Sequence, residues 1–177
     1  MYSHQKNIVT AGTPIAEAKR ALILLHGRGS SAEDILNLAN HFELEDVALF
    51  APQATNNSWY PTSFIAPVIE NQPALDSALS LIKELVNEIS NAGIPTSKIY
   101  FAGFSQGACL TLEYVTRNAQ RYGGVIAFTG GLIGKDINMN NYKGDFKQTP
   151  VLITTGDPDP HVPLRRVELS EGIIKKI

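Results

Sequence analysis

Residues 98–107, Lys-Ile-Tyr-Phe-Ala-Gly-Phe-Ser-Gln-Gly, are the stretch that decides the fold of this chain. The first five residues predict a buried strand, and apolar residues at helical spacing follow residue 107. The Gly-x-Ser-x-Gly pentapeptide between them is typical of a sharp strand-to-helix turn, in which a side chain at either glycine would collide with neighbouring backbone. We therefore expect Ser105 to stand exposed at the helix start, beside free N–H groups and the positive dipole end.

Strand-like and helix-like segments alternate on both sides of this turn. This alternation predicts an α/β fold with a mostly parallel sheet and helices on both faces. The expected strands are 21–25, 47–51, 98–102, 125–129 and 151–155, with 8–11 as a short edge strand, and the longest expected helix carries the apolar residues of 75–89. A capping box of Ser30 and Glu33 is expected to begin the helix after the first buried strand.

Composition limits the classes of function. The chain has 177 residues, 44% of them hydrophobic, and a net charge of -2, which predicts one globular domain over 1–177 and no affinity for nucleic acid. No apolar run is long enough to span a membrane and the first residues lack a signal-peptide pattern, so we expect a cytoplasmic protein. Cys109 is the only cysteine, which excludes an internal disulfide and a cysteine metal cluster, and we expect it to be a buried, unreactive thiol.

The segment His26-Gly-Arg-Gly29 follows the strand at 21–25 and precedes a helix. In parallel sheets such loops gather with others at the carboxyl ends of the strands. A nucleophilic serine needs two N–H donors for its oxyanion, one from this loop and one from the residue after the serine. The backbone N–H groups of Arg28 and Gln106 are therefore the candidate donors, and His26 is expected to shape the loop.

An alternative interpretation of the same loop is nucleotide binding. The pattern Gly27-x-Gly29-x-x-Ala32 also fits a dinucleotide fingerprint. That fingerprint requires an acid at the end of the second strand, which here reads Phe50-Ala51-Pro52, and Asp46 lies at the wrong end of that strand. The sequence therefore favours the oxyanion loop over a nucleotide site.

A third loop, Gly156-Asp-Pro-Asp-Pro-His-Val-Pro163, offers a carboxylate downstream of the serine. Both Asp157 and Asp159 are candidates to orient a histidine base, in the chain order serine, acid, histidine. His161 is a poor candidate for that base because it leaves the same tight turn as Asp159. His4 and His41 lie in segments with no evident reason to approach the strand ends.

These motifs together resemble the phospholipase/carboxylesterase family of the α/β-hydrolases, which includes the acyl-protein thioesterases. The resemblance runs from about residue 20 to 167, and its markers are Leu25-His-Gly-Arg-Gly29, Ala51-Pro52, Trp59-Tyr60, Gly103-Phe-Ser-Gln-Gly107 and Gly156-x-x-Asp159-x-x-Val162-Pro163. It implies a serine carboxylesterase without cofactor or metal, acting on a small ester, thioester or lipid-like substrate, often as a homodimer. It also implies Ser105 and Asp159 as the catalytic pair, and it favours Asp159 over Asp157.

The resemblance further implies contacts to substrate from His26, Trp59 and Tyr60, with Phe64 beside them, although the aromatic side chains could equally pack the long loop of residues 53–72. Family members carry the catalytic histidine after a further strand, and no position here matches it. We therefore expect the last strand and helix of the fold to be absent and this chain to be impaired. The other hypothesis is a non-catalytic binding protein that keeps the pocket and lacks the base.

Overall fold

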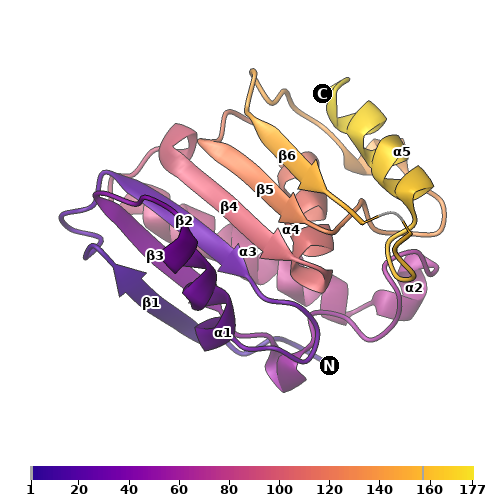
Figure 1. The fold of residues 1–177 in the computed structure, drawn as a ribbon, viewed down its shortest axis with the longest axis horizontal. Helices are drawn as coiled ribbons and strands as arrows, with labels where there is room; N and C mark the ends of the chain where they lie inside the picture. The colour runs from indigo at the N-terminus through magenta and orange to yellow at the C-terminus, as the bar shows by residue number, and fades with distance from the viewer. Residues whose placement is uncertain (1, 157) are drawn as a thin grey trace.

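The computed structural model describes residues 2–156 and 158–177, which form a six-stranded sheet in the order β1-β3-β2-β4-β5-β6 (Figure 1). β1 runs antiparallel to β3, and every other pair of neighbours is parallel. The strands are β1 (Ile8–Gly12), β2 (Arg20–Leu25), β3 (Val47–Pro52), β4 (Ile99–Phe104), β5 (Gly124–Phe128) and β6 (Val151–Thr154). The predicted mostly parallel sheet is therefore confirmed.

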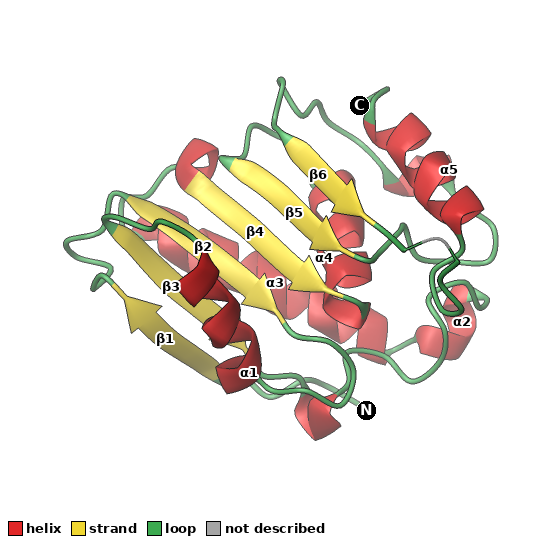
Figure 2. Cartoon of the chain, in the orientation of Figure 1, coloured by secondary structure: helices red, strands yellow, loops and turns green. Residues whose placement is uncertain are grey.

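Helices cover both faces of the sheet, as expected (Figure 2). α1 lies on one face, α3 and α4 lie on the opposite face, and α5 lies beside β6 (Figure 1). The helices are α1 (Ala32–Leu36), α2 (Val68–Asn71), α3 (Ala74–Asn91), α4 (Gln106–Arg117) and α5 (Leu164–Ile174), with 3-10 turns η1 (Asn37–His41), η2 (Thr55–Asn57), η3 (Thr96–Lys98) and η4 (Met139–Asn141). In the described part of the chain, none of these helices has the length and hydropathy that a membrane crossing requires.

The continuous apolar run of β2 is explained by burial on both faces. Leu22 and Leu24 belong to the smaller core cluster, which includes Ala32 and Ile35 of α1. Ile23 and its alternate neighbours belong to the larger cluster, with the buried stripes of α3 and α4. Because successive side chains of a strand point to opposite faces, both halves of the run are needed to fill the two cores.

The start of α1 differs from the expectation by one residue. The capping box is formed by Ser31 and Asp34, not by Ser30 and Glu33. Ser31 has the extended backbone that an N-cap needs, and its side chain accepts from the N–H of Asp34 at 3.1 Å. Ser30 donates its hydroxyl hydrogen bond to the Asp34 carboxylate at 3.0 Å, and the Ser31 N–H donates to the same carboxylate. The acidic residue of the capping box is therefore Asp34, whereas the sequence pattern predicted Glu33.

The register of the parallel strands aligns their carboxyl ends. Leu25 pairs with Gly103, Phe104 pairs with Phe128, and Phe128 pairs with Thr154. The three loops singled out in the sequence leave this one edge of the sheet, after β2, β4 and β6. The fold thus collects them at the place where parallel sheets carry their chemistry.

Candidate functional site: a serine turn and its cleft

Ser105 is the residue between β4 and α4, and its backbone is strained. Its φ of 51° and ψ of -115° lie in a region that side-chain-bearing residues rarely adopt. Two hydrogen bonds hold this conformation, because the Ser105 N–H donates to the Phe128 carbonyl at 2.9 Å and the Ser105 carbonyl accepts from the Cys109 N–H at 3.0 Å. The residue is half-buried. The strand, the turn and the helix therefore present the Ser105 side chain at the edge of the sheet.

The two flanking glycines are required by space. A Cβ on Gly103 would lie 2.6 Å from the Thr111 hydroxyl oxygen, and one on Gly107 would lie 2.6 Å from the His26 carbonyl oxygen. Real Cβ atoms do not approach other heavy atoms within 3.0 Å. The expected collision with neighbouring backbone is confirmed at both glycines, because a Cβ on Gly103 would meet the carbonyl group of Gly107 and one on Gly107 would meet the end of β2.

The loop after β2 lies against the serine turn. A Cβ on Gly27 would be 3.7 Å from the Cβ of Ser105. Gln106 is the first residue of α4, so its N–H has no partner within the helix. Within residues 2–156 and 158–177, the backbone N–H groups of Arg28 and Gln106 donate to no acceptor. The role of both groups as donors to an oxyanion stays a prediction.

The side chains of Arg28 and Gln106 bind a different partner, the segment 58–62. The Gln106 amide oxygen accepts from the Trp59 N–H at 2.9 Å, and its nitrogen donates to the Tyr60 carbonyl at 2.8 Å. The Arg28 guanidinium donates to the carbonyls of Pro61 and Thr62 at 3.0 and 2.6 Å. The sequence predicted only backbone roles for Arg28 and Gln106, and no local pattern predicts these side-chain contacts, which join residues more than 30 positions apart.

A cleft of about 540 Å³ opens in front of Ser105. Arg28, Gln106 and Tyr60 line it together with the serine. The remaining lining residues are Pro61, Thr62, Ser63, Phe64, Cys109, His161 and Val162. The structure thus brings the expected nucleophile, both expected donor residues and two of the expected aromatic residues, Tyr60 and Phe64, into one cavity.

His26 and Trp59 have no exposed surface and do not line this cleft. The His26 ring donates from Nδ1 to the Gly27 carbonyl at 2.7 Å and accepts at Nε2 from the Ala54 N–H at 3.0 Å. Burial lowers the pKa of His26, which fits this neutral form. The Trp59 indole N–H donates to the His26 carbonyl at 2.9 Å. These two side chains hold the loops around the cleft, and contact between either of them and substrate stays a prediction.

Asp159 accepts two backbone hydrogen bonds at one carboxylate oxygen, from the N–H groups of His161 and Val162 at 2.7 and 2.9 Å. These bonds lower the pKa of Asp159 and favour its ionised form. His161 and Val162 line the cleft, so the carboxylate lies in the turn that borders it. Asp157, the other candidate acid, lies outside the described residues.

His4 lies closer to the site than the sequence suggested. Its Nε2–H donates to the Trp59 carbonyl at 2.9 Å, and its Nδ1 accepts from the Thr55 N–H at 3.1 Å. The expectation that His4 has no reason to approach the strand ends is wrong, because the N-terminal segment packs on the long loop. Both ring nitrogens are occupied by backbone, so His4 is a structural residue.

Cys109 is buried, as expected, although it contributes to the floor of the cleft. Desolvation raises the pKa of its thiol to about 12. A thiol of this kind is protonated at neutral pH and is a poor nucleophile. Ser105 is therefore the better candidate for nucleophilic chemistry in this cleft.

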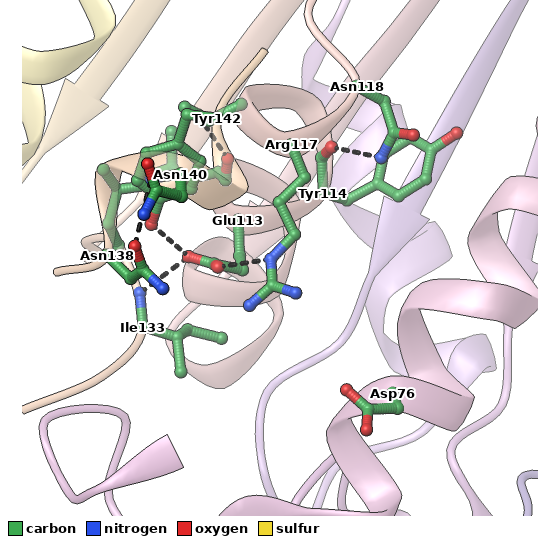
Figure 3. Close-up of polar contacts among 12 residues, drawn as sticks. Asp76, Glu113, Tyr114, Arg117, Asn118, Ile133, Asn138, Asn140 and Tyr142 are labelled. Carbon is green, nitrogen blue, oxygen red and sulfur yellow. Dashed lines mark hydrogen bonds and ion pairs between the residues drawn. The ribbon is translucent and has the colours of Figure 1, made fainter.

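A buried carboxylate, Glu113, joins α4 to residues 133 and 142 (Figure 3). Glu113 of α4 accepts from Arg117 Nε at 2.6 Å, from the Ile133 N–H at 2.9 Å and from the Tyr142 hydroxyl at 3.0 Å. The Gly134 N–H in turn donates to the carbonyl of Phe64, which lines the cleft. Residues 130–149 carry no local sequence signal that predicts this network.

No group of His, Cys, Asp and Glu side chains in the described residues is arranged to hold a metal ion. The candidate site comprises the serine turn, the two N–H donors and the carboxylate of Asp159 in the turn that borders the cleft. These parts come from three loops at the same sheet edge, because the turn between β4 and α4 carries both Ser105 and Gln106, the loop after β2 carries Arg28, and the loop after β6 carries Asp159.

Comparison with known proteins gives a consistent result. Residues 6–177 match the family model described as Phospholipase/Carboxylesterase. A crystal structure of a phospholipase/carboxylesterase from Dyadobacter fermentans is 63% identical, with a TM-score of 0.98, covering 99% of this chain and 84% of that chain. Acyl-protein thioesterase 1 of Yarrowia lipolytica is 25% identical over 86% of this chain and 75% of its own length, and that of Saccharomyces cerevisiae is 27% identical over 89% and 78%. The chain has the α/β-hydrolase fold and belongs to the phospholipase/carboxylesterase family.

Proposed function

We propose that this protein is a serine hydrolase that cleaves carboxylic esters or thioesters through an acyl-serine intermediate. The family and its relatives support hydrolysis of this kind of bond. The observation that carries the proposal is the position of Ser105, held on a strained turn in a cleft beside two N–H groups that bond no acceptor in the described residues. Strained backbone and unpaired donors are typical of sites where charge develops during a reaction.

In the first half of the reaction, Ser105 Oγ attacks the carbonyl carbon of the substrate while a general base takes the hydroxyl proton. The carbonyl oxygen becomes an oxyanion and accepts from the N–H groups of Arg28 and Gln106. Collapse of this intermediate breaks the bond to the alcohol or thiol, which leaves with the proton. In the second half, water attacks the acyl-serine in the same way and releases the carboxylic acid.

Asp159 is the proposed acid that orients the base. Its ionised carboxylate fits the role of holding an imidazole and stabilising the charged ring. Among the described residues, no imidazole is hydrogen-bonded to both Ser105 and Asp159. His161 lines the cleft but leaves the same turn as Asp159, so a His161→Ala variant is expected to keep the reactivity of the parent protein.

A fluorophosphonate probe tests the proposal on the full-length gene product, which is the parent protein of the variants below, because the probe reacts with activated serines and needs no knowledge of the substrate. We expect one phosphonate on Ser105 by peptide mass spectrometry, together with hydrolysis of short p-nitrophenyl esters. Ser105→Ala should abolish both, whereas Ser90→Ala, which removes a buried hydroxyl in α3, should change neither. Absence of labelling of the parent protein, or labelling of another serine, would overturn the proposal.

A further inference from the structure

The segment 58–62 is held by the side chains of the same two residues whose backbone N–H groups are the proposed oxyanion donors. Arg28 comes from the loop after β2, and Gln106 begins α4 after β4. Their side chains reach the segment from these two separate elements. The segment 58–62 therefore connects the two donor residues, although it belongs neither to the loop after β2 nor to α4.

Ser58 is the point at which both side chains meet. Its Oγ accepts from Arg28 Nη1 at 3.1 Å and from Gln106 Nε2 at 3.3 Å. The same hydroxyl donates to the Tyr60 carbonyl at 2.9 Å. A serine hydroxyl has one donor and two acceptor sites, so the capacity of Ser58 is completely used by these three bonds. The Ser58 hydroxyl thus links the loop after β2 to the start of α4, whereas a hydroxyl that stabilised only its own loop would bond groups of that loop alone.

The spacing of the two N–H groups matters because an oxyanion hole acts through its geometry. The donors must lie within hydrogen-bond distance of the oxyanion, and not of the ground-state carbonyl alone. The loop of Arg28 carries one more cross-link, from the Gly29 N–H to the Asn57 carbonyl at 2.7 Å, just before Ser58. A small displacement of either donor lowers the stabilisation of the transition state more than the binding of the substrate.

We propose that Ser58 is a positioning residue that fixes the Arg28 and Gln106 N–H groups relative to each other, a role that rests on the proposed function. Removal of one oxyanion donor lowers kcat by roughly 100-fold to 1,000-fold in a serine protease. Ser58→Ala keeps both donors and loosens them, so we expect a smaller loss in kcat, of about 10-fold, with little change in KM. Ser58→Thr keeps the hydroxyl and should retain most of the activity.

The experiment compares the parent protein with Ser58→Ala, Ser58→Thr and the control Ser90→Ala. The readouts are kcat and KM for a p-nitrophenyl ester, the affinity for a boronic acid that forms a tetrahedral adduct, and the affinity for a carboxylate product. Circular dichroism ensures that only folded protein is compared. We expect Ser58→Ala to lower kcat and boronate affinity together, and to leave carboxylate affinity near that of the parent.

Amide hydrogen exchange of Gly29 and Trp59, whose N–H groups donate to the Asn57 carbonyl and to the Gln106 amide oxygen, provides a readout that does not depend on turnover. Both amides should exchange faster in Ser58→Ala than in Ser58→Thr or the parent protein. A folded Ser58→Ala variant with parental kcat, boronate affinity and exchange rates would overturn the positioning role, and so would a change in KM alone. Failure of the proposed function is distinguished because the parent protein itself would then resist the fluorophosphonate.

Discussion

Gly107→Ala tests the packing on which the whole site depends. A Cβ at this position would lie 2.5 Å from the carbonyl carbon of Leu25, whereas real Cβ atoms keep at least 3.0 Å. The end of β2 or the start of α4 must therefore move by more than 0.5 Å, the difference between these two distances, because the carbonyl oxygen of Leu25 would lie closer still. The obstacle is backbone, which cannot rotate away as a flexible side chain can.

The expected cost follows from this displacement. Forcing extra atoms into a packed interior destabilises by about 1–3 kcal/mol, and backbone obstacles lie at the upper end. In a domain of this size, 1 kcal/mol shifts Tm by about 2–4 °C, so Gly107→Ala should lower Tm by roughly 4–12 °C. The same movement separates Gln106 from the loop of Arg28, and a 1 Å misplacement can cost about 100-fold in rate.

Gly172→Ala is the matched control, because this glycine also lies in a helix but a Cβ there would meet no atom within 4 Å. Alanine is favoured over glycine in a helix by about 1 kcal/mol, so this variant should be slightly more stable than the parent. Urea and thermal unfolding of both variants, with fluorophosphonate labelling rates, provide the comparison. Equal stabilisation by the two substitutions would refute the close contact between α4 and the end of β2.

Three further predictions concern buried groups. Burial lowers the pKa of His26, so below pH 6.5 the unfolded chain binds a proton that the native protein does not. As the pH decreases, the free energy of unfolding should therefore decrease by at most about 1.4 kcal/mol per pH unit for this residue. His26→Gln should flatten the slope measured by urea unfolding between pH 7 and 5, and an unchanged slope would contradict this. Glu113→Ala removes a buried acceptor of three hydrogen bonds and should lower the free energy of unfolding by about 3–5 kcal/mol. The control Glu171→Ala breaks an exposed ion pair with the same i,i+4 spacing and should lower it by under about 0.5 kcal/mol in the same assay. The raised pKa of Cys109, about 12, predicts no reaction with a thiol reagent in the native protein and one equivalent after denaturation; fast native labelling would disprove it.

The parts of the site that the sequence predicted are those built from neighbouring residues. The turn at Ser105 needs only a strand, two glycines and a helix in succession, and all of these lie within a short stretch. The loop of Arg28 was placed correctly because parallel strands bring their carboxyl ends together whatever the details of packing. The cap of α1 shows the limit of local signals, since Ser30 and Ser31 both suit the role and only the backbone entering the helix selects Ser31.

The roles of individual side chains around the cleft required the folded structure. Trp59 and Tyr60 are adjacent and both aromatic, yet only Tyr60 lines the cavity, because the Trp59 indole turns inward to the His26 carbonyl. His4 reaches the same loop from the N-terminus, a contact that no sequence pattern announces.

The sequence by itself determined the mostly parallel sheet, the three loops at its carboxyl edge and the serine turn, because hydrophobic periodicity and glycine spacing are set by residues that are close together in the chain. Only the tertiary structure decided that Ser58 joins Arg28 to Gln106 and that Glu113 binds Ile133 and Tyr142. Each of these contacts links positions 20 or more apart. Their partners are chosen by how the elements pack, since a polar side chain takes whichever group the fold places within hydrogen-bond distance.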